Sequence, residues 1–202
     1  MKIIDGLKLD GWQVEIPDCV RTDLPEFFKE MGFKVGAEIG VFTGLFSEVL
    51  CRAGLKVYSI DPWIIYPEFY GPFGNQERQE KYYEKTKKRL APYDCVIIRK
   101  TSMEAVKDFE DGSLDFVYID GSHDFMHVTE DIWEWSKKVK KGGIISGHDY
   151  YNKDTGDVPA HVHVKYVLDS YTKAYKIPKW YIIGKENKST SDRDRSWFWF
   201  NE

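Results

Sequence analysis

The chain has 202 residues, a formal net charge of −4 and an aromatic content of 16%. This length fits one domain with a sizeable core, because two domains of half the size would each bury too little surface. The acidic balance, without a basic block, argues against nucleic acid and anionic membranes as partners. It favours a neutral or cationic small molecule.

The sequence also bears on the compartment. No apolar run approaches the ~20 residues needed to cross a bilayer, and the first residues lack the charged and apolar regions of a signal peptide. Three cysteines, Cys19, Cys51 and Cys95, are odd in number and widely spaced, which is typical of reduced thiols. We therefore expect a cytoplasmic protein without disulfides.

Short apolar runs alternate with longer charged helical patterns, which is typical of repeated βα units around a parallel sheet. A helix over 23–31 comes first, with Pro25 in its first turn and Gly32 at its end. The expected strands then cover 35–39, 56–60, 95–99, 114–119 and 143–146, and the expected helices cover 44–53, 76–90, 102–108, 124–139 and 161–175.

Two late apolar runs, 180–183 and 197–200, predict an antiparallel hairpin at the edge of the sheet. The predicted fold is thus α/β and Rossmann-like: a doubly wound, mostly parallel seven-stranded sheet with an antiparallel C-terminal edge hairpin. Residues 1–33 are expected to form an N-terminal extension whose helix covers one face like a lid. Residues 34–202 are expected to form the main domain.

Open α/β sheets bind ligands at the carboxyl ends of their strands, so the first strand-to-helix turn is a candidate site. There Gly40 and Gly44 flank Val41-Phe42-Thr43, which permits a tight turn close to a ligand. The turn lacks the patterns of a P-loop and of a dinucleotide site. Asp61 ends the second strand, where a carboxylate can bind ribose hydroxyls. A nucleoside without a pyrophosphate fits both features.

Acidic and imidazole side chains follow the fourth and fifth expected strands. Asp120 and His123 come after the fourth strand, and His148 and Asp149 come after the fifth. Because these strands are neighbours in this fold, the four side chains should converge beside the ligand. Their donors can hold a divalent cation. The alternative is that Asp120 caps the next helix and the other pair begins a loop.

The pattern Glu38-x-Gly40-x-x-x-Gly44, followed by Ser59-Ile60-Asp61-Pro62-Trp63, resembles motifs I and II of class I methyltransferases. The resemblance implies S-adenosyl-L-methionine as cofactor, with the turn against its methionine moiety and Asp61 on its ribose. The implied cofactor-binding residues are Glu38, Gly40, Val41, Phe42, Gly44, Asp61, Trp63, Ser102, Met103 and Asp120. Ser102 and Met103 would neighbour the adenine. Glu38 has an alternative structural role, which is to bond backbone amides near the turn.

The second half, with Asp120-Gly121-Ser122-His123 and His148-Asp149, resembles methyltransferase family 24, which includes macrocin O-methyltransferase-like members. The resemblance covers roughly residues 34–200. It implies Asp120 and His123 as catalytic residues, with His123 removing the proton of the substrate, and Asp120, His148 and Asp149 as metal ligands. His148 replaces an acid of the family pattern, and imidazole suits manganese or zinc better than magnesium.

Aromatic residues gather in 63–73 and are interrupted by proline and glycine. We expect this segment to form a lid, with Trp63, Tyr66 and Tyr70 facing the substrate, joined by Tyr150 after the fifth strand. The alternative is a hydrophobic plug or the contact of a homodimer.

The sequence therefore predicts an S-adenosylmethionine-dependent enzyme that O-methylates a small hydroxylated metabolite or sugar, assisted by a divalent cation (Mg, Mn or Zn). One alternative is a non-catalytic protein that binds the nucleoside cofactor. A nucleotide-linked oxidoreductase is less favoured, because the turn lacks a pyrophosphate-binding glycine pattern. A metal phosphohydrolase of the His-Asp type is disfavoured, because its ligands lie on helices of an all-helical fold.

Overall fold

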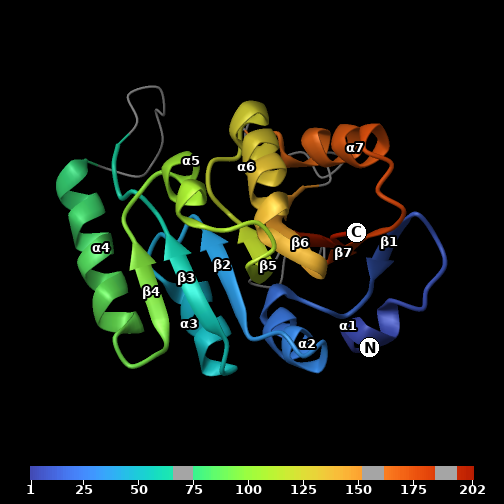
Figure 1. Ribbon diagram of the computed structural model, residues 1–202, viewed down its shortest axis with the longest axis horizontal. Coiled ribbons are helices and arrows are strands. Elements are labelled where there is room, and N and C mark those ends of the chain that lie inside the picture. The colour runs from blue at the N-terminus through green and yellow to red at the C-terminus, as the bar shows by residue number, and fades with distance from the viewer. Residues whose placement is uncertain (66–74, 152–161, 185–194) are drawn as a thin grey trace.

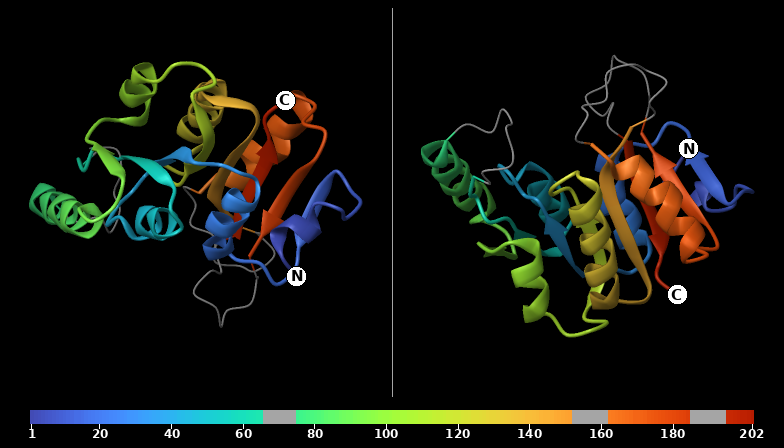
Figure 2. Two further views of the ribbon diagram at one scale, coloured as in Figure 1. Left: turned by 60° about the horizontal axis from the view of Figure 1, so that its bottom comes forward. Right: turned by 90° about the horizontal axis from the view of Figure 1, so that it is seen from above.

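The computed structural model describes residues 1–65, 75–151, 162–184 and 195–202 (Figure 1). An eight-stranded sheet, in the order β1-β7-β8-β6-β5-β2-β3-β4, lies between helices on both faces (Figure 2). The strands are β1 (Gln13–Ile16), β2 (Val35–Ile39), β3 (Lys56–Ile60), β4 (Cys95–Ile98), β5 (Leu114–Ile119), β6 (Val139–Tyr150), β7 (Trp180–Ile183) and β8 (Arg195–Phe200). In this sheet β8 alone runs antiparallel to its neighbours.

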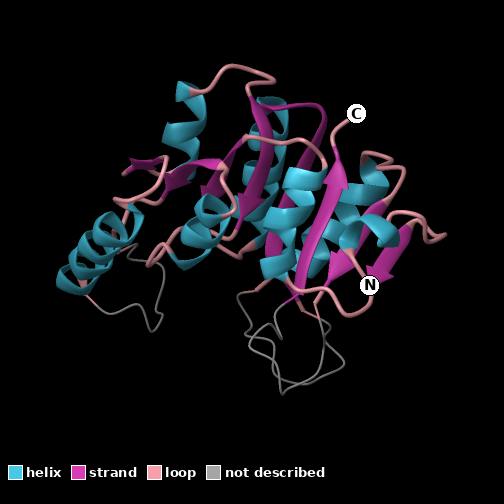
Figure 3. Ribbon diagram, turned by 90° about the horizontal axis from the view of Figure 1, so that it is seen from below, coloured by secondary structure: helices cyan, strands magenta, loops and turns pink. Residues whose placement is uncertain are grey.

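The helices lie in two layers, one on each face of the sheet (Figure 3). Each layer packs against the sheet in a hydrophobic core of its own. They are α1 (Ile3–Gly6), α2 (Leu24–Glu30), α3 (Leu45–Arg52), α4 (Gln76–Leu90), α5 (Ser102–Ala105), α6 (Phe125–Lys138) and α7 (Val164–Ala174), with 3-10 turns η1 (Arg21–Asp23) and η2 (Val106–Asp108). Side chains of β5 alternate between the layers: Phe116 and Tyr118 pack with α2 and α3, whereas Val117 and Ile119 pack with α6. Burying each such side chain stabilises the fold by roughly 1.5–3 kcal/mol.

The predicted doubly wound α/β fold is confirmed, with one strand more than expected. Strand β1 pairs in parallel with β7, so the antiparallel pair β7 and β8 does not form the edge of the sheet. Val14 and Ile16 are buried while Gln13 and Glu15 are exposed, which is the alternation of a strand with one covered face. The first 33 residues thus contribute a strand to the sheet as well as α2 on its face.

Most predicted elements lie within one or two residues of their observed bounds, and three differ more. The helix expected over 161–175 is α7, which begins only at Val164. β6 is much longer than the expected 143–146, because it pairs with β5 on one side and β8 on the other. The helix expected over 102–108 is α5 followed by η2. No helix in the described parts of the chain is both long and apolar enough to cross a membrane.

Candidate active site

The order of the strands reverses beside β2, since β3 and β4 lie on one side of it and β5 on the other. Gly40 follows β2 at this point and Asp120 follows β5. The Asp120 backbone N–H donates to the Ile39 carbonyl at 2.7 Å. A Cβ on Gly40, whose φ is +86°, would lie 2.1 Å from the Asp120 carbonyl oxygen. Only glycine lets the two loops meet here, where open α/β sheets bind ligands.

Asp61 fixes the glycine turn to the end of β3. Its Oδ2 accepts hydrogen bonds from the backbone N–H groups of Val41 (3.0 Å) and Phe42 (2.8 Å), and its Oδ1 accepts one from Trp63 (2.7 Å). Burial raises the pKa of the Asp61 carboxyl, and the three amide hydrogen bonds oppose that rise. A carboxylate has about four acceptor positions, so Asp61 retains capacity for a ligand hydroxyl.

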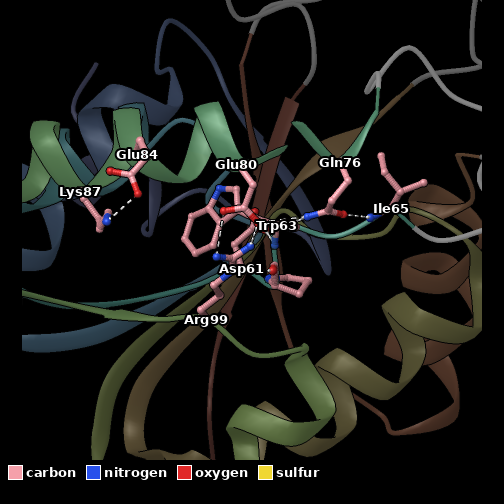
Figure 4. A network of polar contacts seen from close by, with 9 residues as sticks. Asp61, Trp63, Ile65, Gln76, Glu80, Glu84, Lys87 and Arg99 are labelled. Carbon is pink, nitrogen blue, oxygen red and sulfur yellow. Dashed lines mark hydrogen bonds and ion pairs between the residues drawn. The ribbon is translucent and has the colours of Figure 1, made fainter. Parts of the chain in front are cut away.

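Trp63 lies beneath the glycine turn. Its side chain is 1% exposed, its indole N–H donates to the Phe42 carbonyl at 2.8 Å, and its ring packs against Tyr83. The Gln76 side chain, at the start of α4, donates to the Trp63 carbonyl at 2.9 Å (Figure 4). Trp63 therefore supports the turn from below, and its ring does not face an open pocket as expected. The buried space under the turn is where a large aromatic ring stabilises most.

Tyr150 is also buried where a substrate-facing position was expected. Its hydroxyl accepts a hydrogen bond from the Gln13 side chain at 3.1 Å, and its ring packs edge-on against Trp180. The cause is that β6 continues as far as Tyr150 and directs its side chain into the core. The expected substrate contacts Tyr66 and Tyr70 lie outside the described residues.

Glu38 is buried between β2 and α3. Its carboxyl group accepts a hydrogen bond from the Ser47 hydroxyl, and that hydroxyl lies 2.6 Å from the Ser59 hydroxyl. Burial raises the pKa of Glu38 to about 8. Its partner is a side chain of α3 and not the backbone amides considered above, because residue 38 points toward the α3 face of the sheet. Glu38 thus supports the turn by tying the end of β2 to α3, the helix that follows the turn.

Ser102 and Met103 begin α5, after β4. The Ser102 hydroxyl donates to Asp131 on α6 and accepts from the Trp135 indole N–H at 2.8 Å. Met103 is half-buried against the core. Burial raises the pKa of the Asp131 carboxyl to about 7. Asp131 was missed from the sequence, although an acid on the apolar face of α6, beside Val128 and Trp135, was a signal.

The structure brings together four predicted residues: Asp120 and His123 follow β5, and His148 and Asp149 lie near the end of the neighbouring strand β6. His123 Nδ1 lies 3.3 Å from Asp149 Oδ2, and His148 Nδ1 lies 3.6 Å from the same oxygen. His148 Nδ1 also lies 3.8 Å from Asp120 Oδ1. Asp149 has a φ of +59°, a conformation that few non-glycine residues adopt.

The two carboxyl groups of this cluster differ in their readiness to ionise. Burial raises the pKa of Asp120 to about 6, against the opposing influence of His148. Burial would also raise the pKa of Asp149, but its hydrogen bond with His148 and the charge of His123 outweigh burial and hold that pKa well below its usual range. Environments that shift the pKa values of two neighbouring carboxyl groups in opposite directions are typical of sites that perform acid-base chemistry.

Asp120, His123 and Asp149 each offer one donor atom, and these atoms lie within 4.8 Å of one another. In this grouping His123 takes the position that the sequence assigned to His148. Two carboxylate oxygens and one imidazole nitrogen suit manganese, iron or zinc. The donor set therefore fits a divalent cation.

A residue that the sequence analysis missed also reaches this cluster. Arg21 Nη1 lies 3.5 Å from Asp120 Oδ2, and the guanidinium lies over the Phe46 ring at 5.6 Å from its centroid. Nothing in the spacing of the sequence marks Arg21, because only the path of the N-terminal segment across the sheet brings it to Asp120.

The glycine turn, Asp61 and the cluster at the ends of β5 and β6 all fall within one region of known sequence similarity. A family model described as a methyltransferase domain, that of methyltransferase family 24, matches residues 33–150, more than half of the chain. The chain belongs to this family. The family 24 match begins after η1 and α2, so Arg21 lies outside it.

One curated relative of this family 24 methyltransferase chain is the uncharacterized protein y4gI of Sinorhizobium fredii (strain NBRC 101917 / NGR234). The two are 33% identical over 60 residues, which are 30% of this chain. The chain spans 7% of the length of that relative.

Solved structures resemble the family 24 chain more extensively, though at low identity. The O-methyltransferase TomG from Streptomyces achromogenes, in complex with SAM, matches with a TM-score of 0.62 and 13% identity over 90% of this chain and 79% of its own. The O-methyltransferase from Bacillus cereus, in complex with SAH, gives 0.59 and 14% over 88% and 77%. The N-methyltransferase NodS from Bradyrhizobium japonicum WM9 gives 0.60 and 13% over 90% and 94%. These likenesses show the fold.

Proposed function

We propose that the chain is an S-adenosylmethionine-dependent methyltransferase that transfers a methyl group to the hydroxyl of a small molecule, with help from a divalent cation. The close approach of Gly40 and Asp120 carries the proposal, because it joins the turn that would bind the cofactor to the cluster that would perform the chemistry. Family membership and the SAM and SAH named with two similar structures support the choice of cofactor.

Exposed apolar side chains support a cofactor site at this edge of the sheet. Phe42 in the turn and Leu45 at the start of α3 are exposed, as are Phe125 and Met126 at the start of α6. Apolar groups that remain in water at the ligand end of a sheet are suited to contact an adenine ring or the apolar part of an acceptor. The ribose would bind at Asp61, whose carboxylate already orders the turn.

Methyl transfer from a sulfonium is a direct displacement, so the protein mainly aligns the acceptor oxygen with the methyl carbon and the leaving sulfur. Asp149 Oδ2 beside His123 Nδ1 would hold that imidazole with Nε2 as the atom that accepts the proton of the acceptor. A divalent cation held by Asp120 and Asp149, with His123 as the base and not as a ligand, would lower the pKa of the acceptor hydroxyl. The nucleophile would thus be generated beside the methyl donor.

We also propose a small molecule, and not nucleic acid, as the acceptor, because the net charge of −4 would repel phosphates. A homodimer is proposed from Trp133 and Tyr175, which pack together at 5.4 Å between ring centroids and stay exposed on α6 and α7. Light scattering that shows a monomer at micromolar concentration would refute the dimer.

Calorimetric titration with S-adenosylhomocysteine tests the cofactor assignment, and we expect saturable binding at one site per chain. Folded protein that gives no binding heat would overturn the proposed function. Methyl transfer to a panel of hydroxylated acceptors, with and without a chelator, then tests the reaction. Binding of S-adenosylhomocysteine without turnover on any acceptor would favour the non-catalytic alternative. Turnover that withstands the chelator would refute the metal.

A further inference from the structure

The N-terminal segment, residues 1–21, leads from β1 to the cluster at Asp120. β1 pairs in parallel with β7, which runs in the same direction as β6. The carboxyl end of β1 therefore lies on the same side of the sheet as the carboxyl ends of β5 and β6, where the candidate site is. Beyond β1, the Cys19 carbonyl accepts a hydrogen bond from the Gly184 N–H at 2.7 Å, which fixes this segment to the end of β7. The turn η1 then begins at Arg21.

Arg21 meets Asp120 on one of its two carboxylate oxygens. Arg21 Nη1 lies 3.5 Å from Oδ2, while Oδ1 faces His148 Nδ1 at 3.8 Å. The guanidinium is further held over the Phe46 ring of α3, and the Arg21 side chain is 31% exposed. A planar guanidinium suits this combination of ring stacking and ion pairing better than an ammonium group does.

We propose that Arg21 competes with the divalent cation for Asp120. The inference rests on the metal part of the proposed function. Arginine has donors only, so it cannot join the ligands of a cation. It can only neutralise the carboxylate that the cation needs. At 3.5 Å from Asp120 Oδ2, the guanidinium offsets the negative charge that a cation at Asp120 would otherwise meet.

Cation binding consequently requires Arg21 to leave Asp120. A cation bonded to Asp120 would lie only a few ångströms from the guanidinium, where like charges repel strongly even at the effective dielectric constant of a protein surface. The partial exposure of Arg21 gives its side chain a route into solvent. The N-terminal segment thereby lowers the affinity of the site for metal, and it does so from outside the part of the chain that matches the family.

Titration with Mn²⁺ by calorimetry, with the bound ion followed by electron paramagnetic resonance, tests the competition. Arg21→Gln should bind Mn²⁺ about ten-fold more tightly than the wild type, because the competing charge is gone. Arg21→Lys keeps the charge and should stay within about three-fold of the wild type. Arg52→Gln is the matched control, since Arg52 pairs with Glu48 on the surface, and it should leave the affinity unchanged.

Equal Mn²⁺ affinity in the wild type and in folded Arg21→Gln would overturn the role of Arg21 while the metal proposal stands. Arg21→Ala serves the same comparison if the glutamine variant does not fold. Asp120→Asn should abolish Mn²⁺ binding in both backgrounds, and retained binding would place the metal elsewhere and overturn the inference. Absence of Mn²⁺ binding in every variant would overturn both proposals, and binding of S-adenosylhomocysteine in the same samples would show whether the cofactor assignment survives.

Discussion

Replacing Glu38 by glutamine probes the polar network beneath the glycine turn. Glu38 is 2% exposed and accepts a hydrogen bond from the Ser47 hydroxyl, which in turn contacts Ser59. Ser59 Oγ lies 3.1 Å from Cys95 Sγ, so the network continues to β4. Glutamine keeps the shape and the acceptor but cannot ionise. The variant therefore isolates the effect of the charge.

The sign and size of the effect follow from the pKa of Glu38. Burial raises that pKa from 4.5 to about 8, so between these values the folded chain holds a proton that the unfolded chain has lost. The stabilisation from the bound proton is fully present below pH 4.5 and is lost as the pH rises through about 8. At about 1.4 kcal/mol per pH unit, the whole effect is about 5 kcal/mol. Between pH 6 and pH 8 it is about 2 kcal/mol.

Urea unfolding of the wild type and of Glu38→Gln at pH 6, 7 and 8 measures this difference. The free energy of unfolding of the wild type, minus that of the variant, should fall by about 2 kcal/mol across the range. Glu26→Gln, at a side chain that is 67% exposed, is the matched control and should give a flat difference. A flat difference for Glu38→Gln as well would refute the view that this carboxyl is neutral in the fold.

Three further variants separate structure, cofactor binding and chemistry. Asp61→Ala leaves three backbone N–H groups without their acceptor, so we expect a loss of about 3 kcal/mol in urea unfolding and at least ten-fold weaker binding of S-adenosylhomocysteine; an unchanged dissociation constant would contradict the ribose assignment. His123→Ala should lower the turnover number by about 10²-fold or more while calorimetry shows S-adenosylhomocysteine bound as before, and equal turnover would exclude His123 as the base. Gly40→Ala brings a Cβ to 2.1 Å from the backbone of Asp120 and should cost about 3 kcal/mol or more of stability. Wild-type melting of Gly40→Ala would show that the two loops do not meet as described.

The fold could be predicted from the sequence because its signals are local and repeated. Each βα unit combines an apolar run with a helical pattern, and these units specify a parallel sheet without knowledge of distant contacts. β1 escaped prediction for the opposite reason. Its four residues bury two side chains, Val14 and Ile16, and its partner β7 lies at the other end of the chain. Such a short edge strand is defined by its neighbour more than by its own sequence.

The directions of the aromatic side chains could not be read in the same way. In the sequence, Trp63 and Tyr150 both come after apolar runs at the ligand end, which suggested that they face a substrate; in the structure Tyr150 is the last residue of β6. The direction of such a ring depends on the space that other elements leave. Trp63 fills the space beneath the glycine turn, and Tyr150 packs against Trp180 in the core. A large ring fills such a space because burying it stabilises the fold more than exposing it at a pocket.

The two halves of the candidate site differ in how far apart their parts lie in the sequence. The cofactor half joins the glycine turn, at Val41 and Phe42, to Asp61 across one βα unit, so the spacing in the sequence already implies their contact. The chemical half joins Asp120 after β5 to His148 and Asp149 in β6, and to Arg21 in the N-terminal segment. A short pattern predicts the acids because each lies at or just past the carboxyl end of its own strand. It cannot predict the arginine, since β1 and the segment after it bring Arg21 to the site. The positive charge of Arg21 beside Asp120 therefore depends on the pairing of β1 with the sheet.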